Sequence, residues 1–136
     1  MIDLNRFLKA QENTYDIALE EIRAGKKKTH WMWFIFPQLK GLGFSSTSMY
    51  YGIDGKEEAI AYYNHPILGA RLKEICGVLE SLKETNPVKI FGSIDALKLC
   101  SCLTLFYKVS NDEIFKNLLI KYYNGQFDEN TLKMID

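Results

Sequence analysis

The sequence predicts an all-α fold: a compact single domain over residues 1–136, with about seven or eight short helices around a central aromatic helix. Apolar residues recur at the three- and four-residue spacing of an amphipathic helix along most of the chain. No segment alternates apolar and polar residues between turn signals, as hairpin strands do. With 136 residues, 47% of them hydrophobic, the chain is long enough for one core and short for two domains.

Helices in the first half of the chain are predicted from apolar spacing and from boundary residues. The first two helices carry apolar faces made of Leu4, Phe7 and Leu8, and then of Tyr15, Ala18, Leu19 and Ile22. Asp3 is the expected cap of the first helix, and Gly25 the C-terminal glycine of the second. A short helix is expected to start at Ser45 or Ser46 and to end before Gly52. Asp54 is the expected cap of the next helix, which runs through Tyr63 and is broken at His65-Pro66.

Helices in the second half follow from the same signals. Pro66 is expected to be the first residue of a helix whose stripe holds Leu68, Leu72, Ile75, Leu79 and Leu82. Residues 88–91 are interpreted as a short turn, with a short strand as the alternative. The next stripe, ending near Val109, consists of Ile94, Leu97, Leu103 and Phe106. Asp112 is expected to cap a helix that ends at Asn124-Gly125, and Asp128 to begin a last short helix.

Residues 30–36, HWMWFIF, form an aromatic block. As a helix or as a strand the block presents apolar groups in every direction, so we expect it to be buried. A helix is favoured because no partner strand is visible. The block then predicts that Trp33 belongs to the core, and that its loss costs about 3–5 kcal/mol. The functional alternative is an aromatic surface for a planar ligand, and both hold if one tryptophan edge lines a pocket.

Charge and composition exclude several classes of protein. Lys and Arg number 17, as do Asp and Glu, so binding of nucleic acid through bulk positive charge is not expected. The apolar run 31–37 is far shorter than the roughly 20 residues of a membrane span, and polar residues at 3, 5 and 6 exclude a signal peptide. The three cysteines have no framework spacing, which predicts free thiols and a cytoplasmic location.

Motifs for metals, cofactors and nucleophilic catalysis are missing from the sequence. The two histidines, His30 and His65, lie far apart, and Cys100 and Cys102 point to nearly opposite sides of their predicted helix. No CxxC, HExxH, GxSxG, P-loop or dinucleotide-binding pattern occurs. The sequence therefore predicts no metal site and no cofactor.

Polar residues at helix boundaries and glycine turns are the candidates for a site. His30 and His65 are the candidate acid and base, unless they are satisfied core histidines. The loop from Gly41 to Ser46 carries backbone N–H groups and hydroxyls that suit a phosphate or carboxylate, or it is a plain turn with a cap. Lysines 26–28 form either an anion-attracting rim or a solvated surface, and Arg71 either an anion fork or a surface ion pair. Gly69 inside a helix indicates close approach by a neighbouring helix or a ligand.

Four stretches resemble one known family. They are DLNRFLKAQ (3–11), KTHWMWFIFPQLKGLG (28–43), HPILGARL (65–72) and FGSIDALKLCSCLTLF (91–106). They look like the bacterial domain-of-unknown-function family 1810, whose members are sometimes labelled calpastatin, although an inhibitor of that kind is disordered. The resemblance implies a small, mostly helical domain and no established activity. The cysteines that flank Ser101 depart from the commoner family wording.

Two functions are compatible with these observations. The first is binding of a small anionic ligand, nucleotide- or sugar-phosphate-like, in one polar cleft, with or without catalysis. Its expected lining is His30, Gln38, Gly43, Ser45, His65, Arg71 and Lys98. The alternative is a protein-interaction module whose helices present a groove to a peptide. Convergence of His30 and Arg71 on one pocket favours the first, and scattered polar residues beside an exposed apolar groove favour the second.

Overall fold

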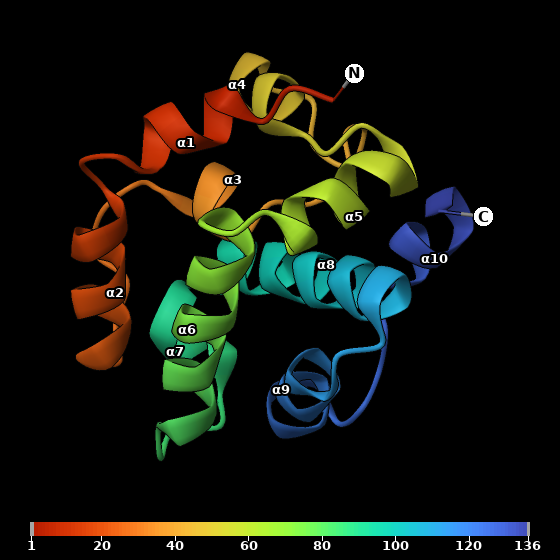
Figure 1. The fold of residues 1–136 in the computed structure, drawn as a ribbon. Helices are drawn as coiled ribbons and strands as arrows, with labels where there is room; N and C mark the ends of the chain where they lie inside the picture. The colour runs from red at the N-terminus through yellow and green to blue at the C-terminus, as the bar shows by residue number, and fades with distance from the viewer. Residues whose placement is uncertain (1, 136) are drawn as a thin grey trace.

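The computed structural model describes residues 2–135, and over that range the chain is helical, without a β-sheet (Figure 1). The predicted all-α fold is confirmed. Within the described range the helices are α1 (Asn5–Gln11), α2 (Tyr15–Arg23), α3 (Met32–Ile35), α4 (Ser46–Tyr51), α5 (Gly55–Asn64), α6 (Leu68–Ser81), α7 (Pro87–Phe91), α8 (Ser93–Ser110), α9 (Glu113–Tyr123) and α10 (Glu129–Ile135). Residues 88–91, interpreted as a turn or strand, are part of α7, because Asn86 accepts the N–H of Val88 and Pro87 begins the helix.

Helix α8 lies at the centre of the molecule and packs against α5, α7, α9 and α10 (Figure 1). Its buried side includes Leu99, Cys102, Leu103 and Phe106. The predicted stripe was wrong in its first turn, because Ile94 and Leu97 are 70% and 71% exposed. These two residues lie at the beginning of α8, on a side that the neighbouring helices leave uncovered.

The aromatic block is buried only in part: Trp31, Met32, Ile35 and Phe36 are buried, and only residues 32–35 of the block are helical. Trp31 is fully buried, and its ring lies 6.1 Å from that of Phe36 and 6.4 Å from that of Phe91. Trp33, in contrast, is only half-buried, which corrects its assignment to the core. The reason is that residues two positions apart on a helical turn, such as Trp31 and Trp33 at the start of α3, point to nearly opposite sides. One tryptophan belongs to the core and the other reaches the surface.

Most helix boundaries agree with the sequence signals. Gly25 has a φ of 79°, and the side chains of Ser45 and Asp112 accept backbone N–H groups at the starts of α4 and α9. Asp54 does not cap α5; instead the Glu58 carboxylate accepts the N–H of Asp54. Helix α6 begins at Leu68 rather than at Pro66, because the Nδ1 atom of His65 accepts the N–H groups of residues 67 and 68.

The Glu21 carboxylate connects α2 to the segment before α3. It accepts hydrogen bonds from the backbone N–H of Lys28 (2.7 Å) and Thr29 (3.0 Å), from the Thr29 hydroxyl (2.6 Å) and from the Trp31 indole (3.0 Å). Desolvation raises the pKa of Glu21, but these donors outweigh it and lower the pKa from 4.5 to about 2. Glu21 thus holds Trp31 in the core as a carboxylate.

The lowered pKa predicts a contribution to stability that depends on pH. Because the carboxylate is favoured in the folded state, the contribution is present above pH 4.5 and is lost as the pH falls towards 2. Allowing for solvent screening, we expect a loss of about 1–2 kcal/mol over that range. Urea unfolding of the wild type and of Glu21→Gln at pH 6 and pH 2.5 measures it. The Glu20→Gln variant, exposed on the same helix, is the control, and an equal pH dependence in all three proteins would contradict the assignment.

The three cysteines are free thiols, as predicted. Cys76 and Cys102 are buried, and burial raises the pKa of the half-buried Cys100 thiol to about 11. None is therefore a thiolate at neutral pH, and they behave as small apolar residues.

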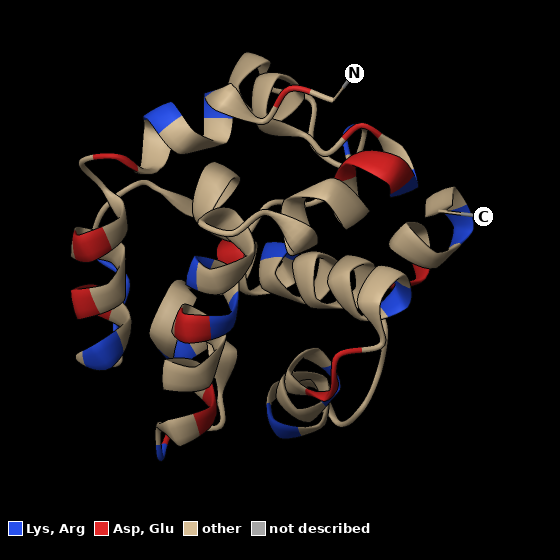
Figure 2. Ribbon diagram, viewed as in Figure 1, with Lys and Arg blue, Asp and Glu red and all other residues tan. Residues whose placement is uncertain are grey.

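Charged residues are distributed over the helices. Both acidic and basic residues lie on α2 and on α6 (Figure 2). This distribution agrees with the balanced composition. Among the helices of residues 2–135, none combines the length and the apolar character needed to cross a bilayer.

Candidate functional site

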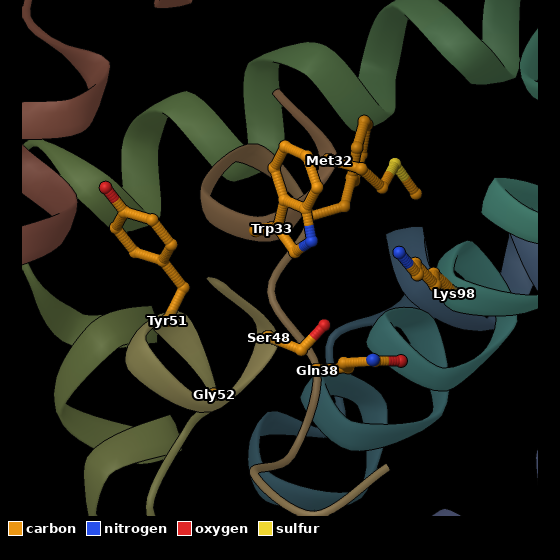
Figure 3. A pocket seen from close by; sticks show the side chains of 8 residues that line it. Met32, Trp33, Gln38, Ser48, Tyr51, Gly52 and Lys98 are labelled. Carbon is orange, nitrogen blue, oxygen red and sulfur yellow. The ribbon is translucent and has the colours of Figure 1, made fainter. Parts of the chain in front are cut away.

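A narrow slot opens between α3, α4 and α8. Its lining consists of Met32, Trp33, Phe36, Gln38, Ser48, Tyr51, Gly52 and Lys98 (Figure 3). The Trp33 indole nitrogen, the Ser48 hydroxyl and the Lys98 ammonium point towards the same space, while the Tyr51 hydroxyl points away from it (Figure 3). The slot has a volume of about 10 Å³, enough for one atom the size of a water oxygen.

A larger groove adjoins the slot and shares Gln38 and Lys98 with it. Its remaining lining is Leu42, Gly43, Ile94, Leu97, Ser101, Asp128 and Asn130. The groove has a volume of about 360 Å³, within the range of small-molecule sites. Gln38 and Lys98 therefore stand at the junction of a one-atom slot and a ligand-sized groove.

The segment that carries Gln38 is held against the end of α4. A parallel bridge joins Leu39 to Ile53, with hydrogen bonds from the N–H of Lys40 to the Ile53 carbonyl (2.8 Å) and from the N–H of Ile53 to the Gln38 carbonyl (2.9 Å). Gly52 permits this approach, because a Cβ atom there would lie 2.5 Å from the Lys40 Cα. The bridge fixes the Gln38 backbone beside the helix that supplies Ser48.

Gly43 permits an equally close approach to Ser48. A Cβ atom on Gly43 would lie 2.7 Å from the Ser48 hydroxyl oxygen and 3.6 Å from the Gln38 amide nitrogen. Ser45 caps α4 by accepting the N–H of Ser48 at 3.1 Å, and its hydroxyl donates to the Ser48 hydroxyl oxygen at 3.0 Å. With its oxygen already accepting, Ser48 keeps its own O–H as a donor. Ser45 acts through Ser48 rather than at the slot itself.

The local charge around the slot is positive. Asp95 lies between two lysines, 3.0 Å from Lys27 Nζ and 3.8 Å from Lys98 Nζ. The Lys27 side chain is 8% exposed and also lies 5.0 Å from the Trp31 ring, so it is the better-buried partner. Lys98 Nζ lies 5.5 Å from the centre of the Trp33 ring. One carboxylate cannot neutralise two ammonium groups, and Lys98 retains the excess charge.

The comparisons with known proteins place the chain in a family. The profile of the family described as "Protein of unknown function (DUF1810)" matches residues 1–135. The chain belongs to this family. It is also similar to a solved structure, that of the conserved hypothetical protein Rv1873 from Mycobacterium tuberculosis, with 46% sequence identity and a TM-score of 0.96. The similarity covers 98% of this chain and 96% of that one. No curated protein matched the chain.

This DUF1810 chain brings together three of the predicted ligand-binding residues, Gln38, Gly43 and Lys98. Ser45 lies next to them as the cap of α4. The expected convergence with the histidines and Arg71 on a single cleft has to be corrected.

His65 and Arg71 line two other hollows of the DUF1810 fold. His65 lies beside residues 2–5, and its Nδ1 atom serves as a cap for α6. Arg71 donates to the Gln11 side chain at 3.4 Å and lies 5.0 Å from the Tyr15 ring. His30 is exposed and belongs to neither the slot nor the groove. All three are polar residues near helix ends. Their separation along the sequence does not show which helix ends lie close together in the folded protein.

Several residues that line the slot and the groove were missed. Trp33 was assigned to the core, but it lines the slot. This agrees with the alternative that one tryptophan edge of the aromatic block lines a pocket. Ser48 was not singled out, and Asp128 was considered only as the start of a helix. One signal was available: residues 94, 97, 98 and 101 share the i, i+3, i+4, i+7 spacing, and a lysine and a serine on that face indicate a solvent-accessible surface. Residues 2–135 bring no three His, Cys, Asp or Glu side chains together as a metal site.

Proposed function

We propose that this protein binds a small anionic ligand, with one anionic oxygen in the slot between Trp33, Ser48 and Lys98. The observation that carries the proposal is the convergence of three hydrogen-bond donors from three separate helices on one space (Figure 3). The indole N–H and the ammonium group can only donate, and the Ser48 hydroxyl oxygen already accepts from Ser45. A carboxylate or phosphate oxygen offers the lone pairs that such a set requires.

The size and polarity of the slot support an anion rather than a bulky group. Its volume admits a single oxygen, so the remainder of the ligand has to extend into the adjoining groove. Met32, Phe36 and Tyr51 surround the slot with apolar surface, and a low local dielectric strengthens hydrogen bonds to a charged oxygen. The excess charge on Lys98 supplies the electrostatic part of the affinity.

The proposal concerns binding and names no reaction. His65 faces a different hollow and uses Nδ1 for the backbone of α6, while His30 does not line the slot. Neither candidate acid or base therefore stands beside the proposed anion. The three free thiols support a reducing compartment, and we place the binding activity in the cytoplasm.

Titration with inorganic phosphate, followed through the indole signals of the ¹⁵N-labelled protein, tests the proposal. Trp33 is half-buried beside the slot, whereas the Trp31 indole donates to Glu21 in the core. We expect phosphate to shift the Trp33 indole signal and to leave the Trp31 signal in place. The Trp33→Phe variant assigns the two signals. A Trp33 signal that stays in place at saturating phosphate would overturn the proposal.

The Lys98→Ala variant tests the electrostatic contribution. Loss of a charged hydrogen bond of about 1.5–3 kcal/mol weakens phosphate binding by roughly tenfold or more. The matched control is Lys108→Ala, since Lys108 lies on the same helix and faces an aromatic ring, that of Phe127, at 5.8 Å. Equal phosphate affinities in the two variants would show that Lys98 does not hold the anion.

One observation favours the second candidate function, a surface for a protein partner. Phe44 is 86% exposed and directly follows Gly43, while Ile94 and Leu97 expose more than two thirds of their surface along the groove. Exposed apolar residues of this size gather at interaction sites. If phosphate leaves the Trp33 signal unchanged, this interpretation of the groove is the better one.

A further inference from the structure

We infer that the ligand is a ribonucleoside monophosphate, a phosphomonoester whose sugar hydroxyls contact Asp128 and whose base covers Ile94 and Leu97. The inference rests on the proposed function, because it takes the anionic end of the ligand to lie at Lys98. It adds the groove, whose lining combines three kinds of side chain. Lys98 and Gln38 are shared with the slot, Ile94 and Leu97 of α8 are aliphatic, and Asp128 and Asn130, at the start of α10, are an acid and an amide.

Asp128 is held in place as a hydrogen-bond acceptor. Its backbone N–H donates to the Thr104 hydroxyl of α8 at 2.9 Å, which fixes the residue beside the groove. Its Oδ2 atom accepts both the N–H of Thr131 (3.0 Å) and the Thr131 hydroxyl (2.6 Å). These bonds orient the carboxylate and leave Oδ1 for a ligand. A carboxylate so placed accepts hydrogen bonds from hydroxyl groups and repels a second anionic group.

Lys98 and Asp128 therefore require different groups on one ligand. A ligand with anionic groups at both positions would be repelled at Asp128, and an uncharged polyol would leave the ammonium of Lys98 without a counter-charge. A phosphomonoester of a sugar satisfies both residues, with the phosphate at Lys98 and hydroxyls at Asp128 and Asn130.

The aliphatic side chains along the groove indicate the third part of the ligand. Ile94 and Leu97 are 70% and 71% exposed, and they lie one turn apart on the side of α8 that also carries Lys98. A sugar phosphate alone offers little apolar surface to cover them, whereas a nucleobase has a flat apolar face. The groove volume of about 360 Å³ is of the size that holds a complete small molecule rather than an isolated ion.

A series of three probes separates the contributions: inorganic phosphate, ribose 5-phosphate and adenosine 5′-monophosphate, each measured by titration calorimetry. We expect the affinity to increase about tenfold at each step. If phosphate binds and adenosine 5′-monophosphate binds no tighter, the inference fails and the anion site stands. If the nucleotide binds no tighter than ribose 5-phosphate, the base does not use the groove and the nucleoside assignment is wrong. If phosphate itself does not bind at the slot, the proposed function fails.

The Asp128→Asn variant tests the hydroxyl contact. The amide retains an oxygen that can accept from Thr131, so the cap of α10 is kept. We expect the ratio of ribose 5-phosphate affinity to phosphate affinity to fall about tenfold, while phosphate affinity stays equal or rises through loss of repulsion. Glu129→Gln removes the same charge one residue away, outside the groove, and is expected to leave that ratio unchanged. A ratio unaffected by Asp128→Asn would overturn the role of Asp128.

The Leu97→Ser variant tests the base contact. Leu97 is mostly exposed, so the substitution leaves the core intact. We expect it to weaken binding of adenosine 5′-monophosphate several-fold and to leave ribose 5-phosphate binding unchanged. Equal losses for the two ligands would contradict a contact with the base.

Discussion

Replacing Trp31 with alanine is expected to lower the free energy of unfolding by about 3–5 kcal/mol, the cost of removing a large aromatic side chain from a core. Trp31 is fully buried and contacts two other buried rings, those of Phe36 and Phe91. Its indole N–H is bonded to Glu21, and the Lys27 ammonium lies over its ring. The substitution thus leaves a cavity and removes one of the hydrogen-bond donors of the Glu21 carboxylate.

Trp33 provides the matched control, since it lies two residues away in the same block. Trp33 is half-buried at the slot, and we expect Trp33→Ala to cost less than about 1.5 kcal/mol. Urea unfolding of both variants at neutral pH, with comparison of the m-values, measures the difference. Equal losses of stability in the two variants would show that the division between core and site tryptophan is wrong.

Replacing Gly69 with alanine is expected to destabilise the protein by about 3 kcal/mol or more, because two helices meet at this residue. A Cβ atom on Gly69 would lie 1.9 Å from the carbonyl oxygen of Tyr63 and 2.8 Å from its carbonyl carbon. Both are backbone atoms at the end of α5, and they cannot move aside as the tip of a side chain can. The close approach expected from a glycine inside a helix is confirmed, and the neighbour is a helix.

Gly77 is the control for this prediction, because it lies on the same helix and a Cβ atom there would meet no neighbouring element within 4 Å. The Gly77→Ala variant is expected to stabilise the protein by about 0.4–1 kcal/mol, since alanine favours the helix and restricts the unfolded chain. The two substitutions are chemically identical and their effects have opposite signs. Thermal and urea unfolding check the pair, and a loss below about 1 kcal/mol in Gly69→Ala would contradict the contact.

Short-range signals predicted the helices well where the chain itself supplies the partners. Helix α4 begins after Ser45 because a serine hydroxyl accepts an N–H three residues on, and α9 begins after Asp112, whose carboxylate accepts an N–H two residues on. The signals were less informative at Asp54, whose N–H bonds to Glu58 while its side chain makes no cap. A suitable residue type at a helix start permits a cap without requiring one.

The candidate site was only partly predictable. Gly43 was expected from a glycine turn, and Gln38 and Lys98 from the resemblance to the family, and the three do lie together. His65 and Arg71 were selected as polar residues near helix boundaries and lie elsewhere. Polar side chains near helix ends are equally suited to capping, to ion pairing and to ligands, and only the positions of the neighbouring elements select among these uses.

The sequence by itself determined the helical class, most helix boundaries, the free thiols and the burial of part of the aromatic block, because each depends on spacing or on contacts within a few residues. Only the tertiary structure decided which face of each helix is covered. Leu99 and Leu103 are buried because α5, α7, α9 and α10 pack around α8, whereas Ile94 and Leu97, equally apolar, lie on the uncovered side and line a groove. Burial is a property of what packs against a side chain, and that depends on segments far away in the chain.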